Sequence, residues 1–316
     1  MSSQSIQSDV PVGNATTTRK PVTLYQFGAM LLLAVMWGLS IPVTKFGLQT
    51  MPPLTLTTMR YGVAVPLLLV FVIVGRHSLP WRALPRVAAL GVLGIGIGQV
   101  AQTFGVAGTS ASAGTIISAT IPVFIVFFAA IRLKQQVSRW QKVGLLAAFA
   151  GIAVVALGHQ GASASAQTTS AGAAWVLLSA LAIAFYYVWS VELTNTYGTA
   201  TVAAWSTLFG FVALLPWCAR EISHAALHVT TQGFVAATYL GVVVTVAGLF
   251  MWLNLLRVVP ARMAASVQYV QPVIGIIAAS ALFGDRIGIS FVLGVAMVLG
   301  GLMLTMTSRS EPGQAS

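Results

Sequence analysis

Polar side chains interrupt an apolar stretch in the C-terminal half of the chain, and their spacing suits hydrogen bonding to a ligand. The stretch covers residues 263–283, and the interrupting residues are Gln268, Tyr269, Gln271 and Pro272. In a helix, Gln268 and Gln271 share one face, and Pro272 leaves the carbonyl of Gln268 without its helical partner. Unpaired polar groups in hydrocarbon cost several kcal/mol. The pattern favours a hydrated cavity at this face, with hydrogen bonding between helices as the alternative.

Other polar and aromatic residues lie inside apolar stretches where they can line the same cavity. Trp37 falls about midway along its stretch, away from the membrane interface where tryptophan is enriched. Small-molecule sites combine apolar and aromatic walls with a few polar groups. The alternatives are helix packing for the serines and interface anchoring for the aromatic residues. The candidate cavity-lining residues are Trp37, Ser40, Gln99, Gln102, Ser118, Tyr186, Trp252, Gln268 and Gln271.

Two basic residues also fall within or at the end of apolar stretches. Arg60 lies about seven residues into its stretch, roughly 11 Å at 1.5 Å per residue. We expect its side chain to extend toward the membrane surface, with contact to a substrate carboxylate as the alternative. We expect Lys45 to extend to the surface as well. The acidic residues lie outside the middle of the apolar stretches, so no carboxylate is expected at depth.

The composition places these stretches in a membrane. The 316 residues are 57% hydrophobic and 7% charged, whereas soluble domains carry about 25% charged residues, and the mean hydropathy is +0.90. The net charge of +11 is divided among connections between apolar stretches, so it forms no continuous basic face for nucleic acid. The single cysteine, Cys218, excludes an internal disulfide and a cysteine-based metal site. No metal or other cofactor is expected.

The apolar stretches number ten, and each is about long enough to cross a bilayer as a helix. Basic residues collect in alternate connections, for example at 76–86 and 132–142. Because basic loops remain in the cytoplasm, we expect both termini on that side of the cell inner membrane. The stretches cover residues 25–46, 54–74, 84–106, 110–131, 139–157, 172–191, 199–218, 231–256, 261–282 and 289–307.

An internal repeat is indicated when the sequence is shifted by 150 residues, because prolines and glycines then coincide without a gap. Five stretches in each half give the second copy the opposite orientation, an arrangement frequent in transporters. The coinciding pairs include Pro66 and Pro216, Gly91 and Gly241, Gly98 and Gly248, Pro122 and Pro272, Gly144 and Gly294, and Gly151 and Gly301. We expect a disordered cytoplasmic tail at 1–22, repeats at 23–157 and 172–307, an external linker at 158–171, and a cytoplasmic tail at 308–316.

Several segments resemble one known family. "LAVMWGLSIPVTKFGL" (33–48), "ASAGTIISATIPVFIVFFAAI" (111–131) and "ARMAASVQYVQPVIGIIAASALFGDRIGISFVLGVAMVLGGLML" (261–304) are similar to EamA-type carriers of the drug/metabolite transporter superfamily. The resemblance covers residues 25–307 and implies ten helices in two inverted five-helix repeats around a central pathway. It also implies export of small metabolites, often amino acids. The leucine-glycine-glutamate element of the family is altered to Leu133-Lys134-Gln135 and Phe283-Gly284-Asp285.

The sequence therefore predicts an all-α membrane protein that exports small metabolites by alternating access. The expected substrates are amino acids, including aromatic ones, or related neutral or zwitterionic compounds, with lipophilic drugs or toxic compounds as the alternative. An enzyme is disfavoured because the chain lacks a carboxylate dyad, a metal cluster and a nucleophile motif. A channel would need a selectivity filter. The expected partners are a small-molecule substrate and the lipid bilayer, with no nucleic acid, and the sequence leaves the oligomeric state open.

Overall fold

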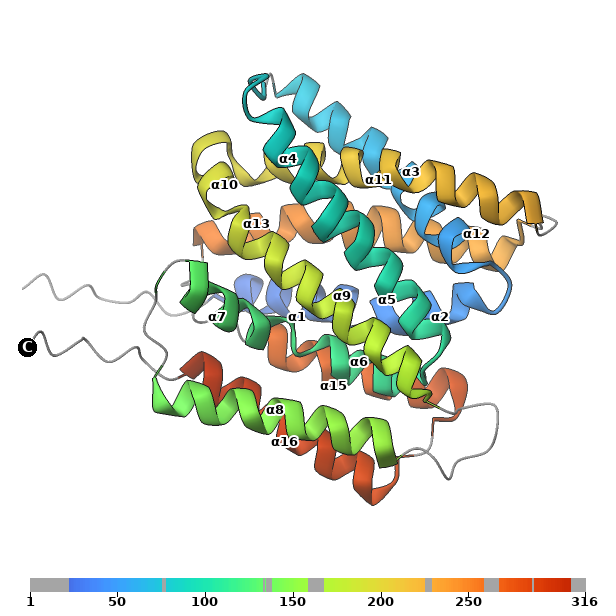
Figure 1. The fold of residues 1–316 in the computed structure, drawn as a ribbon, viewed down its shortest axis with the longest axis vertical. Coiled ribbons are helices and arrows are strands. Elements are labelled where there is room, and N and C mark those ends of the chain that lie inside the picture. Colours follow the sequence, from blue (N-terminus) through green and yellow to red (C-terminus); the bar gives the residue numbers. More distant parts are fainter. Residues whose placement is uncertain are drawn as a thin grey trace, which may run out of the picture.

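The computed structural model describes residues 23–75, 78–132, 134, 138–158, 168–224, 229–258, 267–285 and 287–307. Within these ranges the chain folds into a bundle of helices and has no β-strand (Figure 1). The all-helical class expected from the sequence is therefore confirmed. The two expected tails, and most of the linker expected at 158–171, lie outside the described residues.

The first half of the described chain contains helices that begin at recognisable caps. The Thr23 side chain accepts from the Gln26 amide, and the Ser110 side chain accepts from the Ala113 amide. Such caps satisfy amides that have no partner within the helix. The elements are α1 (Leu24–Gly38), α2 (Ser40–Leu48), α3 (Pro53–Val74), α4 (Leu84–Leu90), η1 (Gly91–Ile97), α5 (Gly98–Ala107), α6 (Ala111–Ser118), α7 (Ile121–Arg132) and α8 (Arg139–Gly158).

The second half follows the same pattern of long helices with threonine caps. The Thr169 side chain accepts from the Gly172 amide at the start of α9, and the Thr230 side chain accepts from the Gly233 amide at the start of α12. The elements are α9 (Ser170–Trp189), α10 (Val191–Tyr197), α11 (Thr199–His224), α12 (Thr231–Thr238), η2 (Tyr239–Ala247), α13 (Gly248–Val258), α15 (Val267–Phe283) and α16 (Ile289–Thr307).

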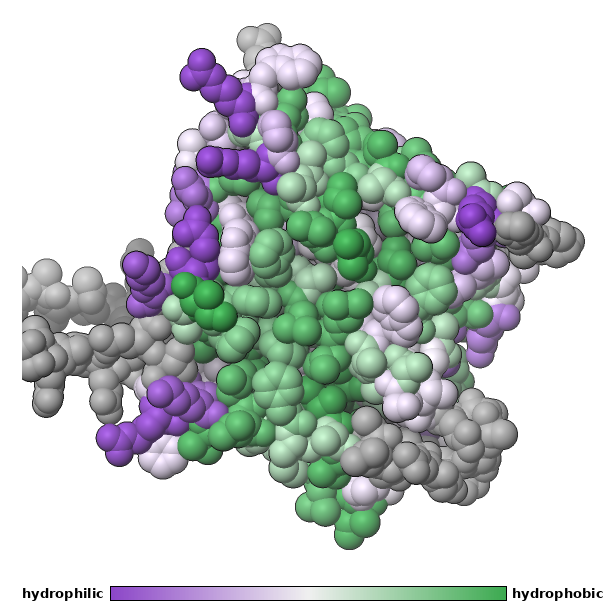
Figure 2. Space-filling view, in the orientation of Figure 1, coloured by the Kyte–Doolittle hydropathy of each residue, from purple (hydrophilic) through white to green (hydrophobic). Residues whose placement is uncertain are grey.

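Seven helical segments of the described chain are long and apolar enough to cross a membrane. Two further apolar helices, Val267–Phe283 and Ile289–Thr305, are shorter. Large apolar side chains such as Ile73 (71% exposed) and Leu146 (69% exposed) lie on the outside of the bundle, and Figure 2 shows apolar residues across its middle. The seven segments are Leu24–Leu48, Pro53–Val74, Leu84–Ala107, Ala111–Arg132, Ser170–Trp189, Thr199–Ser223 and Thr231–Leu255.

Helices α8 and α16 pack against each other along their lengths, at the bottom of Figure 1. A Cβ atom added to Gly144 would lie 2.5 Å from the carbonyl oxygen of Gly301, and one added to Gly151 would lie 2.7 Å from that of Gly294. Residue numbers rise along α8 as they fall along α16, so the two helices are antiparallel. Glycine at these positions lets the two backbones approach closely.

Two π-helical segments, η1 and η2, lie within the long helical segments Leu84–Ala107 and Thr231–Leu255. Glycines in these segments contact other helices. Gly91 packs on the backbone of Ser206 in α11, and a Cβ on Gly241 would lie 2.6 Å from the carbonyl oxygen of Arg60 in α3. The π-helical hydrogen bonding itself had no signal in the hydropathy pattern. Such segments occur frequently at functional sites.

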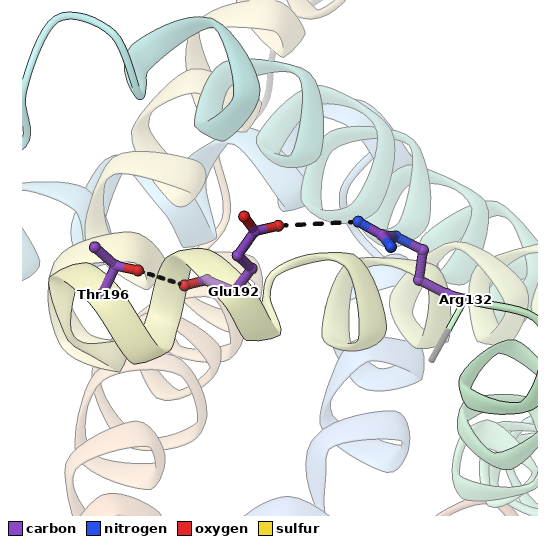
Figure 3. Close-up of polar contacts among 3 residues, drawn as sticks. All are labelled: Arg132, Glu192 and Thr196. Carbon is purple, nitrogen blue, oxygen red and sulfur yellow. Dashed lines mark hydrogen bonds and ion pairs between the residues drawn. The ribbon is translucent and has the colours of Figure 1, made fainter. Parts of the chain in front are cut away.

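The two ends of the bundle differ in charge. Hydrophilic residues gather along the left edge of Figure 2, where α4 and α8 begin and α7 ends in Figure 1. We call this the basic end; its described basic residues include Arg82, Arg86, Arg132, Lys134, Arg139 and Lys142. Here Arg132 lies 3.9 Å from the carboxylate of Glu192 in α10 (Figure 3). Both side chains are exposed, so this pair contributes at most about 1 kcal/mol.

Candidate functional site

A polar cluster lies inside the bundle around Arg60 of α3. Arg60 Nε donates a hydrogen bond to Thr245 Oγ1 of η2 at 3.1 Å, and Arg60 Nη1 donates to Gln99 Oε1 of α5 at 2.9 Å. The guanidinium carbon also lies 5.4 Å from the ring centroid of Tyr61. We call Arg60, Gln99 and Thr245 the Arg60 cluster. The expectation that Arg60 extends to the membrane surface is wrong, because two acceptors from other helices hold its side chain within the bundle.

The Thr245 hydroxyl has the right donor and acceptor arrangement for this position. It donates its own proton to the carbonyl oxygen of Leu240 at 2.8 Å, which leaves its lone pairs free to accept from Arg60. The acceptor lies five residues back along the chain, the spacing of a π-helix. The π-helical turn of η2 therefore supports the orientation of Thr245 toward Arg60.

A pair of tryptophans is joined to the Arg60 cluster through η2. Trp37 Nε1 donates to the carbonyl oxygen of Val244 at 3.1 Å, and Val244 directly precedes Thr245. The rings of Trp37 and Trp252 are 5.7 Å apart between centroids. Tyr239, at the start of η2, donates its hydroxyl to the carbonyl oxygen of Met36 at 3.1 Å. The structure thus brings three of the predicted residues, Trp37, Gln99 and Trp252, close to η2 and to the Arg60 that it binds.

Three other predicted residues lie where α15 meets α1 and α6. Gln268 and Gln271 are half-buried in α15, and a Cβ on Gly38 of α1 would lie 2.7 Å from the carbonyl oxygen of Gln271. Ser118 ends α6, and its buried hydroxyl has no hydrogen-bond partner among the described residues. The described contacts do not connect these three residues to the Arg60 cluster, so their role as cavity lining stays a prediction.

The remaining predicted residues occupy three different surroundings. Ser40 begins α2 directly after the helix break at Leu39, and it is half-buried. Gln102 is half-buried in α5, one turn beyond Gln99. Tyr186 is buried, with its side chain against Gly94 of η1 and within an apolar cluster. The surroundings of Tyr186 are those of a packed core residue.

Two charged side chains, the half-buried Lys45 and the buried Asp285, cap helix ends at the short turn between α5 and α6. Lys45 Nζ donates to the carbonyl oxygens of Val106 at 2.9 Å, Ala107 at 3.1 Å and Thr109 at 2.7 Å. Asp285, which is buried, accepts from the Ser112 amide at 2.8 Å. A cation at a helix C-terminus and an anion at an N-terminus both complement the helix dipole.

The expectation that Lys45 extends to the surface is therefore wrong, because the unpaired carbonyls at the end of α5 supply three acceptors. Glu221 performs a similar task at the start of α3, where its carboxylate accepts from the amides of Leu54 at 3.2 Å and Thr55 at 2.7 Å. We call the end of the bundle that contains Lys45, Glu221 and Asp285 the capped end. Sequence reasoning placed these acids near helix ends but had no signal for which helix each would cap.

A helical bundle with an apolar exterior and a polar and aromatic cluster between its helices has the architecture of a polytopic membrane transporter. The model of the EamA-like transporter family matches residues 26–157 and 170–307. The chain belongs to this family, as its sequence motifs indicated. The family and the relatives below are described as transporters rather than enzymes.

Relatives of this chain share its length and about a quarter of its residues. An "Uncharacterized transporter" of Archaeoglobus fulgidus is 24% identical, covering 89% of this chain and 98% of the relative. The "Uncharacterized inner membrane transporter YedA" of Escherichia coli is 26% identical, covering 83% of this chain and 84% of the relative. A "Probable terminal-alkyne amino-acid exporter" of Streptantibioticus cattleyicolor is 29% identical, covering 87% and 91%. One crystal structure, 18% identical, shares the fold with a TM-score of 0.62, covering 89% of this chain and 98% of the other.

Proposed function

We propose that this protein exports amino acids or related zwitterionic metabolites across the inner membrane by alternating access. The observation that carries the proposal is the composition of the site. The Arg60 cluster and the tryptophan pair combine residues of the first half, such as Gln99 and Trp37, with residues of the second half, such as Thr245 and Trp252. Transporters with internal repeats hold their substrates between the repeats, near mid-membrane. The amino-acid exporter among the relatives supports this substrate class.

We further propose that the seven spans, together with α8, α15 and α16, form ten crossings in two inverted repeats. Shifting the contact between Gly144 and Gly301 by 150 residues turns it into the contact between Gly294 and Gly151, which is also present. A two-fold relation between the halves would produce this reciprocal pair. Lys134 (φ 51°) and Gly284 (φ 64°) also share a left-handed backbone at positions 150 residues apart.

The basic end is proposed to face the cytoplasm, because basic connections are retained there. Single cysteines at exposed positions test this in a chain whose buried Cys218 has been replaced. An impermeant maleimide added to intact cells should label Gly288→Cys at the capped end. It should label Ser78→Cys at the basic end only after the membrane is permeabilised. The reverse labelling pattern would show that the orientation is wrong.

The predicted cavity face of α15 is tested by removing its amides. Gln268→Leu and Gln271→Leu should each reduce transport by about tenfold, because each removes a group that hydrogen-bonds a solute, while membrane insertion is kept or improved. Val270→Leu is the matched control, since Val270 lies between the glutamines on the exposed side of α15. Initial rates are compared at equal amounts of protein in the membrane. Normal rates in both glutamine variants would assign these residues to packing.

The function is tested by efflux from cells that overproduce the protein and are loaded with a panel of radiolabelled amino acids. At least one amino acid, with aromatic ones first, should leave faster than from cells without the protein. The panel includes a lipophilic cation as a comparison. Faster efflux of the cation alone would replace amino-acid export by drug export.

A further inference from the structure

Arg60 carries a positive charge inside the bundle that no carboxylate of the described chain neutralises. The ion pair found in the described residues joins Arg132 to Glu192 at the basic end. Glu221 and Asp285 bind backbone amides at the capped end. The partners of Arg60 itself are the neutral oxygens of Gln99 and Thr245. Arg60 is half-buried, and charges removed from water are normally paired, so the charge of Arg60 fits an anionic group brought by a ligand.

The hydrogen bonds of Arg60 hold its guanidinium in a fixed plane. A guanidinium has five N–H donors, and the contacts to Thr245 and Gln99 use two of them, one on Nε and one on Nη1. Donors on Nη1 and Nη2 are left to bind a carboxylate with two parallel hydrogen bonds, the geometry that makes arginine selective for this group. Gln99 and Thr245 are therefore positioning residues for Arg60.

The tryptophan pair supplies a surface for the rest of such a ligand. Trp37 binds the carbonyl oxygen of Val244, the residue before Thr245, and both Trp37 and Trp252 are half-buried. Aromatic walls bind apolar groups through area and ring contact. The geometry points to Arg60 as the residue that binds the substrate's carboxylate, so that the exported molecules are carboxylates with an apolar or aromatic side chain. This inference rests on the proposed transport function.

The experiment compares phenylalanine with phenethylamine, which lacks only the carboxylate. Both are offered to the purified full-length protein in liposomes, and KM and maximal rate are measured for each. The key variant is Gln99→Glu, which retains an acceptor for Arg60 Nη1 but supplies the counter-charge from the protein. It should raise the KM for phenylalanine at least about tenfold, because the substrate carboxylate then competes with the introduced carboxylate and is repelled by it. The KM for phenethylamine should stay within about threefold or fall.

Arg60→Lys keeps the charge but cannot form the two parallel hydrogen bonds to a carboxylate. It should therefore raise the KM for phenylalanine by about tenfold, with little change in the KM for phenethylamine. A purely structural role for Arg60 predicts the opposite for Gln99→Glu, since a stronger bond to Arg60 would preserve transport of both compounds. Equal KM changes for the two compounds, or none, would overturn the inference. If the wild-type protein exports only compounds without a carboxylate, the inference fails and transport stands. If the wild-type protein moves no compound of the panel, both the inference and the proposed function fail.

Discussion

Gly301→Ala is expected to destabilise the protein by about 2–3 kcal/mol, the upper range for overpacking a close contact. The added Cβ would press on the carbonyl oxygen of Gly144 and lie 2.8 Å from the amide nitrogen of Ala148. Both are backbone atoms, so no side-chain rotation relieves the contact, and α8 and α16 must move apart. The unfolding temperature of the purified protein in detergent measures the effect. It is obtained by heating samples and using size-exclusion chromatography to determine the fraction that remains folded.

The neighbouring residue supplies the control. Gly300 also lies in α16, but a Cβ there would meet no atom within 4 Å. Gly300→Ala should leave stability unchanged or raise it by up to about 1 kcal/mol, the gain in helix propensity. Equal unfolding temperatures for the two variants would contradict the close approach of α8 and α16.

Lys45→Met is expected to destabilise the protein by about 3 kcal/mol or more, because burying unsatisfied polar groups costs about 1–3 kcal/mol each. The substitution removes the donor for three carbonyl oxygens at the end of α5. It also removes a positive charge that attracts the buried carboxylate of Asp285. The same thermal unfolding assay measures the change.

Lys142→Met is the matched control, since Lys142 is exposed at the basic end and surface substitutions usually change stability by less than about 0.5 kcal/mol. Lys45→Met should therefore unfold at a clearly lower temperature than Lys142→Met. Equal unfolding temperatures would show that Lys45 extends into solvent or the lipid headgroups, as its sequence position suggested.

Most helices could be predicted from the sequence, because hydropathy and length determine which segments can enter a bilayer. The segment expected at 54–74 forms α3 at Pro53–Val74, and the one expected at 289–307 forms α16 at Ile289–Thr307. Breaks within helices were not predicted. The turn at Leu39 and the π-helical segments η1 and η2 depend on backbone hydrogen bonds, which hydropathy does not record.

The candidate site was only partly predictable. Helical periodicity shows which residues share a face, but the neighbour of that face depends on how distant helices pack. Arg60 has its acceptors 39 and 185 residues away in the chain. The position of its side chain between the helices therefore could not be predicted from the residues near it in the sequence. Lys45 reaches carbonyls about 60 residues away for the same reason. Trp37 and Trp252 were each selected from the sequence, but their pairing was visible only in the folded chain.

The central claim, that the protein is an alternating-access carrier, is tested most directly by counterflow in liposomes that contain the purified protein. Liposomes are loaded with an excess of the unlabelled compound that the efflux panel identifies, and the labelled compound is added outside at low concentration. A carrier returns to the outside faster when loaded, so labelled compound should accumulate transiently above its external concentration and the initial rate should saturate. Uptake that rises linearly with concentration and is not accelerated by internal substrate would contradict the account.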